Sequence, residues 1–135
     1  MKEILTSLHL WQEISNNCID VWQYLKEKKY NLSFSNGQKQ RFILAKMLYW
    51  LDDEVDVVVL DECTSGLDDK SYEIDSADAQ RILEYVVRYC NKDKKRIVVL
   101  STHQNIDEFK EKMRNDFNIH NLYFAKKGEC NYVEM

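Results

Sequence analysis

The sequence predicts an α/β protein with a short parallel sheet flanked by helices and a helical portion before it. Two runs, at 56–61 and 96–101, each hold four consecutive apolar, mostly β-branched residues, which favours strands buried on both faces of a sheet. Between them, residues 77–91 carry apolar side chains at helical spacing. A strand–helix–strand order predicts a right-handed crossover between parallel strands.

The first 30 residues are predicted to be helical, because their apolar residues recur at spacings of three, four and seven. Asn16 and Asn17 are expected to divide this stretch into two helices. The same spacing fits a coiled-coil seam, but further apolar residues widen the stripe and favour a packed globular helix. The recurring positions are Ile4, Leu8, Trp11, Cys18, Trp22 and Leu25.

A further helix is predicted after a loop at 31–35. Ser35 and Gln38 have the spacing of a capping box, in which each side chain satisfies a free backbone N–H group at the start of a helix. Apolar residues continue this helix to about Asp52. Towards the end of the chain, a helix over about 106–117 and a hairpin from 122–125 and 132–133 complete the predicted elements.

Composition excludes several classes of protein. The chain has 135 residues, 44% of them hydrophobic, and no apolar run approaches the ~20 residues of a membrane-spanning helix. A net charge of −4 argues against a protein that mainly neutralises nucleic-acid phosphates. The four cysteines form no C-x-x-C pair, and no cleavable signal opens the sequence, so we expect reduced thiols in the cytoplasm.

Candidate catalytic groups follow both predicted strands. Asp61 and Glu62 come directly after the first strand, and His103 comes after the second, so parallel strands bring them to one edge of the sheet. One acid can hold Mg²⁺ and the next can polarise a water, while the histidine can contact a phosphate. Each residue taken alone has a simpler interpretation. Asp61 and Glu62 can mark the point where the strand returns to solvent, and His103 can have a structural role.

Two loops add candidate binding groups. The turn at Ser35, Asn36 and Gly37 opens a helix and so presents free N–H groups and a hydroxyl to an anion, although an ordinary helix cap has the same sequence. The segment 64–68, which ends in Asp68, is a tight polar loop.

Taken in order, these motifs resemble the carboxyl-terminal half of an ABC-type ATPase (nucleotide-binding) domain of the transporter kind. Residues 35–41 (SNGQKQR) are similar to its LSGGQ signature, and 57–62 to its Walker B strand. Residues 65–68 (SGLD) are similar to the D-loop, and 101–103 (STH) to the H-loop. The resemblance implies one partial P-loop NTPase domain over 1–135, with about 1–52 in the helical subdomain and about 53–135 in the α/β part.

The resemblance also implies roles. Glu62 and His103 would be catalytic, and Asp61 would hold Mg²⁺. ATP, bound at a dimer interface and hydrolysed to power membrane transport, would contact Ser35, Asn36, Gly37, Gln38 and Asp68. The implied partners are a second ATPase subunit or a chain with a Walker A loop, and a transmembrane transporter domain. The implied location is the cytoplasmic face of a membrane, and no nucleic acid is expected.

The sequence departs from the family pattern in several places. Phe34 and Asn36 replace the usual leucine and first glycine of the signature, Cys63 replaces a proline or alanine, and 69–78 forms a longer, charged insertion. The three glycines, Gly37, Gly66 and Gly128, do not supply the G-x-x-x-x-G-K-[ST] loop that cradles phosphates. We therefore expect little ATPase activity from this chain alone.

Two alternatives to a transport ATPase remain open at this point. The chain can be a truncated or split module that docks onto a complete ATPase without hydrolysing ATP. It can also be the corresponding lobe of an SMC-like chromosome or DNA-repair ATPase, as the heptad-like spacing near the start allows. Gln38 favours the transporter type over this last reading, because SMC-type signatures usually carry glutamate there.

Overall fold

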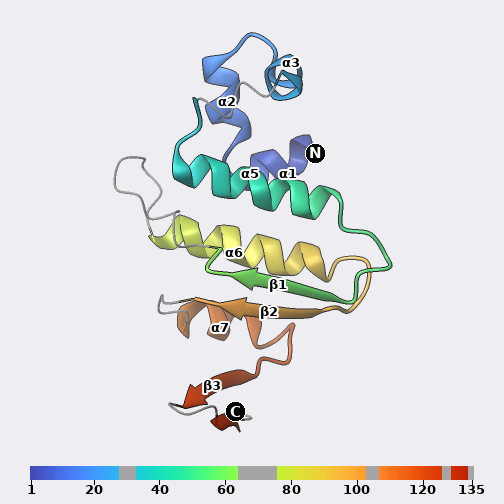
Figure 1. Ribbon diagram of the computed structural model, residues 1–135, viewed down its shortest axis with the longest axis vertical. Helices are drawn as coiled ribbons and strands as arrows, with labels where there is room; N and C mark the ends of the chain where they lie inside the picture. The colour runs from blue at the N-terminus through green and yellow to red at the C-terminus, as the bar shows by residue number, and fades with distance from the viewer. Residues whose placement is uncertain (28–32, 64–75, 103–106, 126–128, 134–135) are drawn as a thin grey trace. The chain divides into compact units, whose positions relative to one another are not determined.

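The computed structural model describes residues 1–27, 33–63, 76–102, 107–125 and 129–133. The chain forms two compact units, Met1–Gln104 and Asn105–Met135, and each is described by itself. Unit 1 contains the parallel strands and every described helix except α7, and unit 2 contains α7 and a hairpin (Figure 1). The predicted mixed α/β class is confirmed at this level.

The start of the chain folds into three short helices, α1 (Lys2–Ser7), α2 (Trp11–Asn17) and α3 (Val21–Lys26). The break after Asn17 was predicted. Asp20 caps α3, because its side chain accepts hydrogen bonds from the backbone N–H groups of Trp22 and Gln23. The break between α1 and α2 was not predicted. It passes through His9, whose φ of 57° lies in the left-handed region and ends the first helix.

Helix α5 (Asn36–Tyr49) begins where the capping box predicted, with Ser35 as its N-cap, and ends three residues before Asp52. Its buried side includes Phe42, Leu44, Ala45 and Leu48. These side chains share one core cluster with Leu5 of α1 and with Leu8, the C-cap of that helix, and both leucines are fully buried. Burial of this apolar surface holds the first helices against α5.

Strands β1 (Val57–Asp61) and β2 (Ile97–Ser101) pair in parallel, with Val57 opposite Ile97 and Asp61 opposite Ser101. The connection is α6 (Ser76–Cys90), so the strand–helix–strand prediction is confirmed. On one face of the sheet, Val58 and Leu60 join Ile82 and Val86 of α6 in the core cluster. The second helix layer, α5, packs on α6 on the side away from the strands (Figure 1).

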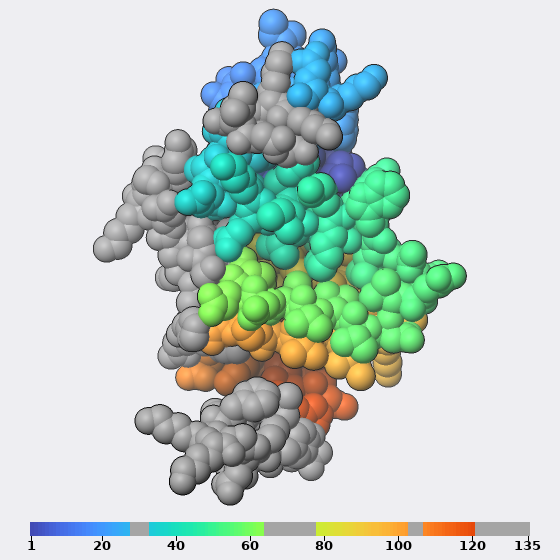
Figure 2. All heavy atoms as spheres, in the orientation of Figure 1, coloured from blue at the N-terminus to red at the C-terminus, as the bar shows by residue number. Residues whose placement is uncertain are grey.

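The prediction that both strands are buried on both faces was wrong for the described structure. Four β-branched residues on the second face are 40–66% exposed: Val57, Val59, Ile97 and Val99. We call these four residues the open face. Across the two strands, Val57 lies opposite Ile97 and Val59 lies opposite Val99. In Figure 2 the teal atoms of α5, the green atoms of β1 and the orange atoms of β2 follow one another across the surface. A run of apolar residues predicted a strand but carried no information on whether a second layer covers it.

Unit 2 contains α7 (Asp107–Met113) and an antiparallel pair, β3 (Asn121–Ala125) with β4 (Glu129–Val133). The hairpin was predicted, although its turn around Lys127 and Gly128 lies outside the described residues. The helix is shorter than the predicted 106–117, and it buries Phe109 and Met113. Within the described residues, no helix combines the length and apolar character needed to cross a membrane.

Candidate functional site

The loop that opens α5 is held by a reciprocal capping box. The Ser35 hydroxyl oxygen accepts the Gln38 backbone N–H at 3.2 Å, and the Gln38 side-chain oxygen accepts the Ser35 backbone N–H at 3.0 Å. The bond to Ser35 uses a lone pair of its oxygen, so the hydroxyl can still act as a donor. Asn36 is exposed and Gly37 is buried. The loop therefore combines a fixed backbone with a helix N-terminus, where the dipole favours an anion.

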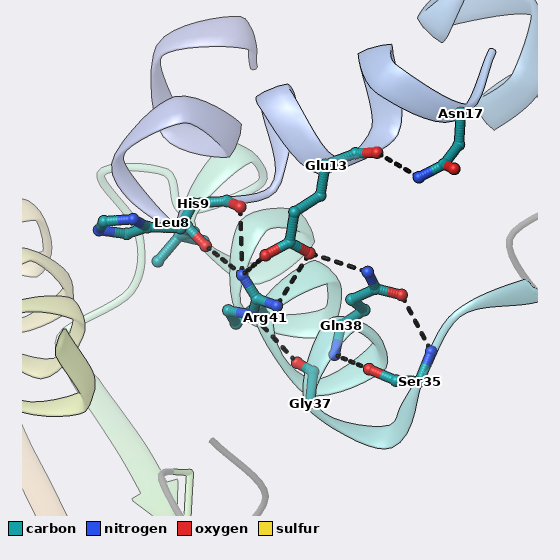
Figure 3. Close-up of polar contacts among 8 residues, drawn as sticks. All are labelled: Leu8, His9, Glu13, Asn17, Ser35, Gly37, Gln38 and Arg41. Carbon is teal, nitrogen blue, oxygen red and sulfur yellow. Dashed lines mark hydrogen bonds and ion pairs between the residues drawn. The ribbon is translucent and has the colours of Figure 1, made fainter. Parts of the chain in front are cut away.

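The side chain of Gln38 points towards Glu13 of α2 (Figure 3). Its amide nitrogen donates to Oε2 of Glu13 in α2 at 2.8 Å, while its oxygen is occupied by the cap. Both polar atoms of this amide thus have partners within the chain. The arrangement indicates that Gln38 supports the loop.

Arg41, one turn further along α5, is 1% exposed. It belongs to the same hydrogen-bond network, because it also donates to Glu13. Two of its nitrogens donate to the two carboxylate oxygens of Glu13, at 2.9 and 3.0 Å. It also donates to the backbone carbonyls of Leu8 and His9 at 3.2 Å, and to that of Gly37 at 3.4 Å. A buried guanidinium is tolerated because these acceptors replace water around it.

The sequence assigned no role to Glu13 or to the side chain of Arg41. Nothing in the pattern marks Glu13, since a carboxylate on an amphipathic helix normally lies in solvent. The sequence likewise does not show whether Arg41, at the end of the signature-like motif, lies in solvent or is buried in an ion pair. Their pairing depends on how α2 packs on α5, which links residues 28 positions apart.

The second group of candidate residues lies where β1 and β2 end. Asp61 is the last residue of β1, and its Oδ1 accepts the Ser101 hydroxyl at 2.5 Å. Glu62 follows with a φ of 44°, and its backbone N–H donates to the Ser101 carbonyl at 3.0 Å. A non-glycine residue in this left-handed region costs about 1–2 kcal/mol, and such strain is concentrated at functional sites.

Both acids are exposed, and Asp61 belongs to the same side of β1 as Val57 and Val59. The open face is therefore apolar along the strands and polar at their carboxyl ends. The N-terminus of α5 and the carboxyl ends of both strands lie towards the same end of unit 1 in Figure 1. The predicted residues Asp68 and His103 lie outside the described residues.

The donors at this edge fit Mg²⁺ only in part. Mg²⁺ is usually held by one or two carboxylates, with waters and substrate phosphates as its other ligands. Asp61 and Glu62 can supply the protein share, and in the described part of the chain no cluster of three or more His, Cys, Asp or Glu residues forms a complete metal site. The chemistry of the donors is thus compatible with a metal that arrives with phosphates.

Two thiols of the described chain, those of Cys63 and Cys90, have raised pKa values. Burial raises the pKa of Cys63, next to the two acids, to about 11, and burial raises that of Cys90 to about 11 as well. Both thiols, and that of Cys18, are free of disulfides. At neutral pH a thiol with so high a pKa stays protonated and is a poor nucleophile.

Comparison with known proteins found no matching family model, no matching curated protein and no matching solved structure.

Proposed function

We propose that this chain is the carboxyl-terminal part of an ABC-type ATPase domain and contributes to a Mg-ATP site shared with another polypeptide segment. The proposal is carried by one combination: a capped signature-like loop at Ser35–Gln38, followed by acids at the carboxyl end of an apolar strand in a parallel pair. The motifs occur in the order expected for the P-loop NTPase fold of this family.

Each candidate residue has a role in this proposal. The Ser35 hydroxyl, Asn36 and the N–H groups around Gly37 contact the phosphates of an ATP held by the partner. Gln38 keeps that loop in place through its two internal hydrogen bonds. The D-loop residue Asp68 completes the contacts to the nucleotide.

The acids at the strand ends account for the chemistry. Asp61 is a ligand for Mg²⁺, which neutralises charge on the phosphates when it is bound. Glu62 orients and polarises the attacking water, and His103 contacts the terminal phosphate. The hydrogen bond from Ser101 fixes the Asp61 carboxylate, and the chain leaves the strand at Glu62, whose backbone is left-handed.

The partner segment supplies the Walker A loop and covers the open face. Parallel sheets normally have both faces covered, whereas here four β-branched side chains are exposed beside the Asp61–Ser101 pair. A helix placed on this face would bury apolar surface, and a strand paired at an edge of the sheet would bring bound phosphates to the carboxyl ends of the strands. The segment can belong to a second chain or to the same protein.

Transport across a membrane is the process that the ATPase is proposed to power. The chain would then act at the cytoplasmic face of a membrane, against a transmembrane transporter domain. This part of the proposal rests on the resemblance of residues 35–41, in which Gln38 is followed by a basic residue, to transporter-type signatures.

A docking module that does not hydrolyse ATP is the second candidate, and the open face favours it equally. The SMC-like alternative has less support. Its coiled coil would run through the first helices, but α1, α2 and α3 have only 6, 7 and 6 residues and are separated by turns.

The test measures ATP turnover by this chain assembled with a segment that carries a Walker A loop. Glu62→Gln should lower kcat by about 10²–10⁴-fold and leave the Kd for Mg-ATP unchanged, because it removes the general base but keeps the side-chain shape. Glu54→Gln, an exposed acid before β1, is the matched control and should turn over ATP at the normal rate.

Three outcomes would contradict parts of the proposal. Unchanged turnover in Glu62→Gln removes the catalytic role of this residue. Normal ATP binding with no turnover in the unmodified assembly selects the docking module. Titration calorimetry of the chain alone should show no submicromolar binding of Mg-ATP, and tight binding would disprove the need for a partner's phosphate cradle.

A further inference from the structure

The Glu13 carboxylate lies at the centre of the polar network in Figure 3. It receives hydrogen bonds from two side chains of α5, those of Gln38 and Arg41. These two side chains in turn contact the loop on both sides of Asn36. Gln38 accepts the backbone N–H of Ser35, and Arg41 donates to the carbonyl of Gly37.

We propose that Glu13 is a positioning residue that fixes the Ser35–Gly37 loop for contact with a nucleotide phosphate. The inference rests on the proposed function for the identity of the ligand. The effect of Glu13 on the geometry of the loop follows from this chain's own contacts.

The first argument is the continuity of the hydrogen bonds. The carboxylate orients the Gln38 amide, the oriented amide presents its oxygen to Ser35, and the Ser35 hydroxyl holds the Gln38 backbone. An amide without the Glu13 acceptor could rotate about its terminal torsion, which is broad for this side chain. The cap would then lose one of its two bonds.

The second argument concerns charge. A carboxylate near the start of a helix competes with an anionic ligand for the positive end of the dipole. The bidentate pair with Arg41 cancels the charge of Glu13 while keeping its acceptor oxygens in place. Glu13 can therefore hold the loop without repelling a phosphate, because Arg41 neutralises its charge.

An exchange of the two side chains tests the inference in the full chain. Glu13→Gln removes the charged acceptor, and Gln38→Glu places two carboxylates where the 2.8 Å hydrogen bond now lies. In each single variant, hydrogen exchange at the Ser35 and Gln38 amides should become about tenfold faster, the loss expected for a charge-assisted bond. In the double variant the introduced amide donates to the introduced carboxylate, so exchange at these two positions should be slower than in either single variant, although Arg41 still lacks its two carboxylate acceptors.

Two controls separate positioning from general destabilisation. Amides in the middle of α6, such as those of Ile82 and Val86, report the stability of the whole unit, so in each single variant they should accelerate by a smaller factor than the Ser35 and Gln38 amides. Asp78→Asn removes an exposed ion pair with Arg81 and should leave the Ser35 and Gln38 amides unchanged. Equal acceleration at α6 would mean that Glu13 acts only on global stability, which overturns the inference.

The functional readout uses the same variants in the assembly with a Walker A segment. The single variants should lower kcat about tenfold, and the double variant should recover part of this loss. Altered exchange at the loop with unchanged turnover overturns a positioning role, as does normal exchange in the single variants. An unmodified assembly without any turnover refutes the proposed ATPase, while the exchange experiment still decides whether Glu13 holds the loop.

Discussion

Glu13 and Arg41 form a two-point ion pair in which both carboxylate oxygens accept guanidinium hydrogens, at 2.9 and 3.0 Å. The Arg41 side chain is 1% exposed and that of Glu13 is 32% exposed, so the pair lies at the margin of the core. It joins α2 to α5 and contacts the signature-like loop, because Glu13 accepts from the Gln38 amide and Arg41 donates to the Gly37 carbonyl. The same arginine also satisfies two carbonyls in the turn at Leu8 and His9.

Replacing this arginine tests how much the network contributes to folding. We expect Arg41→Lys to lower the free energy of unfolding by about 1–3 kcal/mol, because an ammonium group cannot reach both carboxylate oxygens and the buried carbonyls. Urea denaturation measures the change. Lys39→Met, at an exposed position of the same helix, should stay within about 0.5 kcal/mol of the original chain, and a similar loss there would show that the network is not the cause.

Neighbouring valines in β1 test whether the open face is uncovered in solution. Val58 is 6% exposed and Val59 is 66% exposed. Val58→Ala should cost about 1.5–3 kcal/mol of unfolding free energy, because it removes buried apolar surface, whereas Val59→Ala should cost less than about 1 kcal/mol. Equal costs in urea denaturation would mean that part of this chain covers the face. Binding of the complementing segment should raise the cost at Val59.

The buried thiol of Cys90 predicts a loss of stability at alkaline pH. Burial raises its pKa from 9.0 to about 11, so between these values the unfolded chain is ionised at this thiol and the folded chain is not. The unfolding free energy should therefore fall as the pH rises above about 9. Urea denaturation at pH 7, 9 and 10 should give a shallower fall in Cys90→Ala than in the original chain.

Val86→Ala is the matched control for this experiment. It truncates another fully buried side chain of α6 but removes no titratable group. It should lower stability at every pH without changing the slope. A slope that is unchanged in Cys90→Ala would contradict the assignment of the alkaline effect to this thiol.

Much of the local structure could be predicted because it depends on neighbouring residues. The start of α5 follows from Ser35 and Gln38, whose side chains reach each other within one turn. The parallel pairing of β1 and β2 follows from two β-branched runs joined by a helix. The break at His9 had no such signal, since its left-handed backbone depends on packing around Leu8 and Leu10, both fully buried.

By itself, the sequence determined the order of the elements, the cap at Ser35 and the placement of Asp61 and Glu62 at the end of a strand. These features arise from periodicity and short-range hydrogen bonding, which a linear pattern records. Only the tertiary structure decided that Glu13 pairs with Arg41 and that one face of the sheet is exposed. Both depend on which surfaces meet across distant parts of the chain, and the same apolar or charged residue satisfies the local pattern in either arrangement.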